Sequence, residues 1–116
     1  MKYRRVDRVK ELMKREISKI IQFDIKNIDL GFITVTAVEM NNDLRFARVF
    51  VSIFSQNKEK KEIIKTLTAL TGFIKGKIGK RIRLKFMPEI DFKLDDTIEQ
   101  AQKIDEILEK IKSGQC

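Results

Sequence analysis

The chain has 116 residues, a length that suits one domain, and 42% of them are hydrophobic, which is enough to build a core. It contains no histidine, the commonest general base and metal ligand, so most enzyme and metal-centre classes are disfavoured. Its net charge of +8 favours nucleic acid or an anionic membrane surface as partner. A single cysteine, Cys116, excludes an intramolecular disulfide, and neither a secretory signal nor a run of 18 apolar residues is present, so we expect a soluble cytoplasmic protein.

The first predicted element is an amphipathic helix over residues 6–21. Its apolar side chains recur at helical spacing in an otherwise charged segment: Val6, Val9, Leu12, Met13, Ile17, Ile20 and Ile21. Two runs of β-branched and aromatic residues, 32–40 and 44–54, then flank Asn41-Asn42-Asp43, which predicts a β-hairpin. One face of the second run is wholly apolar and has to be covered: Ala47, Val49, Val51 and Ile53.

The helical period returns at Lys58 and continues to Ile78. Gly72 interrupts it, so we predict a bend or a junction between two helices near residues 70–72. Alternation of basic and apolar residues from Arg81 to Phe92 predicts a third strand, with Pro88 at an edge position or a bulge. Residues 96–114 carry capping signals and an apolar stripe, which predict a terminal helix.

These elements predict an α+β protein built as a two-layer sandwich, with three strands covered by helices in the order α-β-β-α-α-β-α. We expect a single domain over residues 1–112 and a flexible tail over residues 113–116.

The stretch Gly76-Lys77-Ile78-Gly79 has the spacing of the G-x-x-G loop with which KH domains clamp a nucleic-acid backbone. Such a loop needs its glycines between two helices, so that main-chain N–H groups can approach phosphates. Periodicity instead places Gly76 inside a helix and Gly79 at its C-terminal end, where glycine is a common cap. We therefore interpret Gly79 as a cap, because a motif with two free positions recurs by accident.

The junction where a clamping loop would belong reads ALTGFIK, residues 69–75. Three longer stretches belong with this junction: RVDRVKELMKREISKII near the start, ITVTAVEMNNDLRFARVFVS in the hairpin and LTGFIKGKIGKRIRLKFMPEIDFKLDDT further on. Through these stretches the chain resembles bacterial ribosome-binding factor A over residues 3–111. The resemblance implies a KH-like fold of type II with a three-stranded mixed sheet, in which an Ala-x-Gly kink replaces the G-x-x-G loop. The kink residues would be Leu70, Thr71 and Gly72, with Leu70 standing at the family's alanine position and Ala69 next to it.

The resemblance also implies a function. Members of the family are non-enzymatic assembly factors that bind the immature small (30S) ribosomal subunit and assist the folding and end-processing of its rRNA, including during growth in the cold. We accordingly expect no cofactor, no metal, no catalytic residue, no small-molecule substrate and a monomer.

The basic residues are concentrated in two regions. Residues 1–22 carry eight basic and three acidic residues, and residues 58–85 carry ten and two. On a helical wheel, one flank of the first helix presents four candidate RNA-binding residues, whose alternative role is a solvated surface stripe: Arg4, Arg8, Arg15 and Lys19. Glu11 and Glu16 are candidate ion-pair partners for this flank.

The second candidate group follows the kink and runs along the polar face of the predicted third strand: Lys75, Lys77, Lys80, Arg81, Arg83 and Lys85. Its alternative role is to protect an exposed strand edge from unwanted pairing. We favour RNA binding, because six positive charges within eleven residues repel one another unless an anion is near.

Three other interpretations are open at this stage. Phe46, Phe50 and Phe54 can stack bases or pack in the core, and we favour the core because helices must bury one sheet face. Asp91, Asp95 and Asp96 lack the loop spacing of a magnesium cage. The rival functions are a protein- or membrane-surface module using the first helix as an anchor, and an RNA-cleaving or RNA-modifying enzyme.

Overall fold

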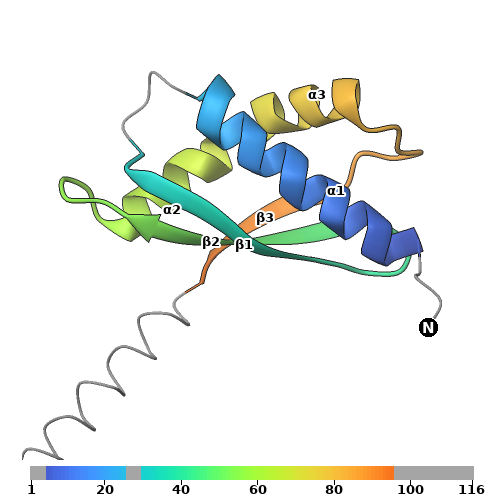
Figure 1. Ribbon diagram of the computed structural model, residues 1–116, viewed down its shortest axis with the longest axis horizontal. Coiled ribbons are helices and arrows are strands. Elements are labelled where there is room, and N and C mark those ends of the chain that lie inside the picture. Colours follow the sequence, from blue (N-terminus) through green and yellow to red (C-terminus); the bar gives the residue numbers. More distant parts are fainter. Residues whose placement is uncertain (1–4, 26–29, 96–116) are drawn as a thin grey trace, which may run out of the picture.

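The computed structural model describes residues 5–25 and 30–95. Three helices lie on one face of a three-stranded sheet, giving two layers (Figure 1). In chain order the elements are α1 (Arg5–Lys19), a π-helical turn η1 (Ile20–Asp24), β1 (Phe32–Met40), β2 (Phe46–Phe54), α2 (Lys60–Ala69), α3 (Thr71–Arg81) and β3 (Glu89–Leu94). The predicted terminal helix and tail lie outside the described residues.

The sheet is mixed, as expected. Strand β2 is central, pairing antiparallel with β1 and parallel with β3. The hairpin turn forms where the Asn/Asp signal predicted it, and the Leu44 N–H donates to the Asn41 carbonyl at 3.0 Å. The register of β1 shifts by one residue between Val35 and Ala37, so Thr36 forms a bulge.

The core lies between the sheet and the helices. Alternate residues of β2 are buried on the helix-facing side, as predicted for Ala47, Val49, Val51 and Ile53. The helices contribute fully buried side chains at helical spacing: Met13, Ile17, Ile20, Ile63, Leu67, Ile74 and Ile78. The predicted apolar stripes are confirmed at these positions, but Phe73, which also fits the stripe by spacing, is 44% exposed.

The first helix does not end as a regular α-helix. Its last turn widens into η1, which buries both Ile20 and Ile21 and leaves Asp24 at its end. The chain then reaches β1 through Gly31, whose φ of 68° lies in the left-handed region. A Cβ at Gly31 would lie 2.5 Å from the Phe54 carbonyl oxygen, so this close approach to the end of β2 requires glycine.

The prediction of the third strand was wrong in its extent. Strand β3 begins at Glu89, and residues 82–88 form an irregular connection after α3. Ile82 and Pro88 are buried there, and Leu84 packs on the core, so the alternation reflects a segment that closes the end of the core. Pro88 has no N–H to donate, and the first ladder bond runs from the Glu89 N–H to the Arg45 carbonyl at 2.9 Å.

The interpretation of Gly79 as a helix cap was also wrong. Helix α3 continues through Gly79 to Arg81, and the N–H of Ile82 still donates to the Ile78 carbonyl at 2.8 Å. Gly76 lies inside the helix, as predicted. The G-x-x-G stretch is therefore helical throughout and does not form a clamping loop.

Candidate nucleic-acid interface

The predicted break between α2 and α3 is confirmed at Leu70. The Leu70 N–H donates to the carbonyls of Thr66 and Leu67 at 3.1 and 3.0 Å, and its own carbonyl accepts from the Ile74 N–H at 2.9 Å. The side chain of Leu70 packs against the core, so the break accommodates a bulky residue. The main chain is thus hydrogen-bonded on both sides of the break.

Threonine hydroxyls reinforce this break. Thr68 Oγ1 donates to the Ile64 carbonyl at 2.8 Å, and Thr71 Oγ1 donates to the Thr68 carbonyl at 2.7 Å. Hydroxyls that bond back to the preceding turn bend helices. Gly72 keeps a conformation outside the left-handed region, and a Cβ added to it would meet nothing within 4 Å. The kink therefore does not depend sterically on glycine, and the main chain at Gly72 is open to solvent.

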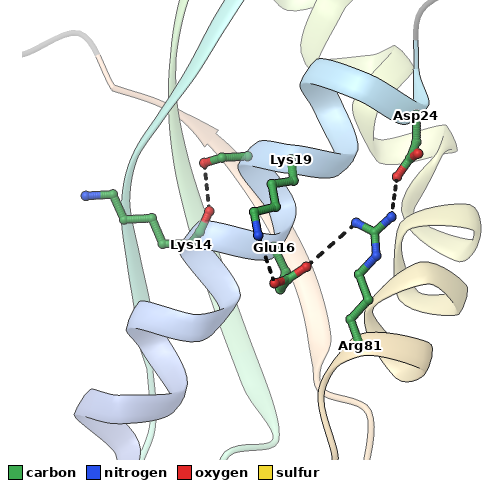
Figure 2. A network of polar contacts seen from close by, with 6 residues as sticks. Lys14, Glu16, Lys19, Asp24 and Arg81 are labelled. Carbon is green, nitrogen blue, oxygen red and sulfur yellow. Dashed lines mark hydrogen bonds and ion pairs between the residues drawn. The ribbon is translucent and has the colours of Figure 1, made fainter.

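Helix α1 lies against α3 (Figure 1), and there one member of each predicted basic group, Lys19 and Arg81, comes to the same carboxylate. Arg81 extends from the end of α3 between two carboxylates (Figure 2). Its Nη2 lies 3.0 Å from Asp24 Oδ2, and its Nη1 lies 3.7 Å from Glu16 Oε2. Lys19 shares Glu16, with Nζ at 3.8 Å from Oε1. The pairing predicted between Glu16 and Lys19 is therefore present, and Arg81 joins it from a distant part of the chain.

This network changes the role expected for Arg81. Glu16 and Asp24 offset its charge and fix its direction, so it links α1 and η1 to α3. The Lys19 side chain is 53% exposed against 15% for Glu16, and its amine points to the Glu16 carboxylate (Figure 2). Beside them Phe23 is 57% exposed and lines a hollow of about 420 Å³ with Glu16, Lys19 and Arg81. Sequence reasoning missed Phe23, because it lies in a segment without periodicity.

The remaining members of the second group differ in their surroundings. Lys75 Nζ lies 3.0 Å from Glu89 Oε2, and Lys77 Nζ lies 5.5 Å from the centre of the Phe73 ring. Lys80 and Arg83 are exposed and make no ion pair with another described residue. The prediction that this group lies along a strand was wrong, because it spans the last turns of α3 and the connection after it.

On the first helix, Arg8, Arg15 and Lys19 are exposed, as a binding flank requires. Arg4 lies outside the described residues. The apolar stripe of α1 is buried against the sheet, with Met13 and Ile17 fully inaccessible. An amphipathic anchor would have to release these side chains into the lipid, so the observed packing disfavours the membrane-surface alternative.

The opposite face of the sheet is open in the part of the chain that the structure describes. Phe32 and Phe54 are cross-strand partners and are 73% and 67% exposed, and Phe46 is 52% exposed. The preference for core packing was therefore wrong for Phe46 and Phe54. Their face lies away from the helices, and only the alternate residues of β2 reach the core. Arg48 lies in register between Glu39 and Asp91, so charges on this face are mixed.

Positive charge follows the helices. Residues 5–25 and 58–85, which supply the helices and the start of the connection after α3, contain sixteen basic and six acidic residues. Residues 30–57 and 86–95, which supply the sheet, contain three basic and five acidic residues. The two layers therefore differ in the sign of their charge, and the helical layer is the candidate surface for a polyanion.

Residues 5–25 and 30–95 contain no group of three or more acidic or cysteine side chains arranged to hold a metal ion. In the same residues, none of the helices is both long enough and apolar enough to cross a membrane.

The fold and its basic helical layer define a KH-like α+β domain of type II with a kinked helix pair. The sequence profile described as ribosome-binding factor A matches residues 5–108. The chain belongs to the ribosome-binding factor A family.

Relatives and solved structures agree with this assignment. Ribosome-binding factor A of Halothermothrix orenii is 46% identical over 112 residues, which cover 97% of this chain and 92% of the relative. The protein of the same name from Brevibacillus brevis is 42% identical, covering 94% and 90%. The crystal structure of ribosome-binding factor A from Thermus thermophilus superposes with a TM-score of 0.69 at 21% identity, covering 77% of this chain and 94% of that one. A homology model of the Thermus thermophilus factor, as fitted into a cryo-EM map of a complex of the 30S subunit with ribosome-binding factor A, gives a TM-score of 0.61 at 20% identity, covering 75% and 91%.

Proposed function

We propose that this protein binds the small ribosomal subunit through its rRNA and assists late maturation of the subunit, including processing of the rRNA ends and growth in the cold. It acts in the cytoplasm as a monomer and does no covalent chemistry. Membership of the ribosome-binding factor A family supports this proposal, as does the complex of the Thermus factor with the 30S subunit.

The observation that carries the proposal is the placement of basic side chains on the helical layer. Phosphates are the most abundant anions on folded rRNA, and binding them releases condensed counterions. Lys80 and Arg83 present cations without a described carboxylate partner, and Arg8, Arg15 and Lys19 add exposed cations on α1. Recognition is mainly of the shape of the RNA backbone, because cations position a protein on phosphates and carry no base sequence.

Binding to purified small subunits over a range of salt concentrations tests the proposal. A Lys80→Gln/Arg83→Gln double variant removes two charges from the helical layer, and an Arg48→Gln/Lys93→Gln variant removes the same number from the sheet face. We expect the first variant to bind more weakly. The slope of the logarithm of its association constant against the logarithm of the salt concentration should be shallower by about 0.7 to 0.9 for each phosphate that the protein no longer neutralises. The second should bind like the unmodified protein.

Two results would contradict the proposal. Binding that does not depend on ionic strength would exclude phosphate contacts, and equally weakened binding by the two double variants would exclude the helical layer as the contact surface. Depletion of the protein in cells tests the maturation step. Subunit rRNA with unprocessed ends should accumulate, and more strongly at low temperature.

A further inference from the structure

A small pocket lies at the hairpin-turn end of the sheet, formed by three segments that are distant in sequence. The start of α1, the turn between β1 and β2 and the connection between α3 and β3 enclose a hollow of about 270 Å³. We call it the turn pocket. The lining residues used below are Arg5, Asn42, Arg45, Lys85 and Phe86.

The turn pocket contains an exposed aromatic ring with cations placed against it. Phe86 is 54% exposed. Arg45 Cζ lies 5.2 Å from the centre of its ring and Lys85 Nζ lies 5.6 Å from it. Arg5 brings a third cation to the pocket, whereas Asp43 is the one carboxylate among the lining residues, so the lining carries an excess of positive charge. A nucleotide matches this arrangement, because its base can take the place of a cation over the half-exposed ring while its phosphate pairs with the displaced cation.

The turn that builds the pocket is held in one conformation. Asn41 Oδ1 accepts from the Phe46 N–H, and Asp43 Oδ1 accepts from the Arg45 N–H, both at 3.1 Å. Leu44 adopts a φ of 61°, and the Glu89 N–H bonds to the Arg45 carbonyl, which ties the turn to the start of β3. Asn42 is exposed and its side chain makes no hydrogen bond with another residue of the described ranges, so within these ranges its donors and acceptor face a ligand unpaired.

We propose that the turn pocket binds one unpaired nucleotide of RNA, with the base stacked on Phe86 and the adjoining phosphate held by Arg5, Arg45 and Lys85. Asn42 then contacts the edge of the base. A nucleobase in a duplex already has neighbours on both faces, so the pocket selects a single-stranded or bulged position. The inference rests on the proposed function, because it takes RNA as the partner. It adds a stacking contact to the phosphate contacts proposed for the helical layer.

The test uses the full chain and a single-stranded RNA decamer with a central 2-aminopurine, whose fluorescence falls when it stacks on an aromatic ring. We expect Phe86→Leu to weaken binding by roughly 5- to 160-fold and to remove the quenching, because base stacking on an aromatic side chain accounts for an effect of about this size. Phe86→Tyr, which keeps a ring, should retain both. Phe54→Leu is the matched control, because Phe54 is also exposed, at 67%, and no cation of the described residues lies over its ring.

Equal quenching by the unmodified protein and by Phe86→Leu, or equally weakened binding by Phe54→Leu, would overturn the inference. Lys85→Gln provides a second variant, which should reduce the salt dependence of decamer binding by about one phosphate contact whether or not Phe86→Leu folds stably. Subunit binding measured in parallel separates the two proposals. If the unmodified protein binds subunits but does not quench the decamer, only the turn pocket is wrong, whereas failure to bind subunits refutes the proposed function.

Discussion

Gly72 offers a direct test of whether the kink is a backbone-contact site. A Cβ at this position meets nothing within 4 Å, and the residue is the second of α3, with an ordinary helical conformation. Replacing a helical glycine by alanine stabilises a protein by roughly 0.5–1 kcal/mol, because the unfolded chain loses conformational freedom. For a domain of about 100 residues this raises Tm by about 2–8 °C. We therefore expect Gly72→Ala to melt at a higher temperature.

Gly76 is the matched control for this substitution. It lies in the same helix, and a Cβ there also meets nothing within 4 Å. Gly76→Ala should raise Tm at least as much, because Gly76 is further from the helix end. If an RNA backbone approaches the kink, Gly72→Ala alone weakens subunit binding despite its higher Tm. A lower Tm for Gly72→Ala would refute the reasoning, since it would mean that the kink requires a conformation only glycine adopts.

Two further predictions concern stability. Gly31→Ala should destabilise the fold by about 1–3 kcal/mol, because the added Cβ would lie 2.5 Å from the Phe54 carbonyl oxygen and φ is 68°. Urea unfolding measures the change in stability. An unchanged urea midpoint would show that the main chain before β1 can shift to make room for the Cβ. Arg81→Glu should lower the free energy of unfolding by about 1 kcal/mol after allowance for solvent screening, because it places a third carboxylate between Glu16 and Asp24. Lys80→Glu is the control and should change the free energy of unfolding by less than about 0.5 kcal/mol. Equal melting temperatures for these two variants would show that the Arg81 pairs contribute nothing.

Local patterns in the sequence predicted most of the elements. The apolar stripe of α1, the Asn/Asp turn and the break near Gly72 depend on residues close together in the chain, and all three appear in the structure. The start of β3 was predicted too early, since alternation from Ile82 to Phe86 is compatible with a strand and with a connection that packs alternate residues on the core. Only the missing donor at Pro88 marks the boundary.

The candidate site was less accessible to sequence reasoning. Arg81 was placed among the binding residues, but its partner Asp24 is 57 residues away, and no periodicity reports such a contact. The alternation of β2 identified the face that the helices cover, through Ala47, Val49, Val51 and Ile53, but it did not show whether the opposite face, with Phe46 and Phe54, is covered as well. The turn pocket combines three separate segments and therefore has no local signature.

The central position of β2 has a consequence for the order in which the protein folds. Its hairpin with β1 is local and can form as soon as residue 54 has been synthesised, whereas its other edge is paired by β3, which follows α2 and α3 in the chain. Parallel pairing over such a separation is slow compared with closing a hairpin. Until Glu89–Leu94 pair with it, this edge of β2 is open to mispairing with other chains, and the addition of β3 replaces a nine-residue open edge by one of six residues.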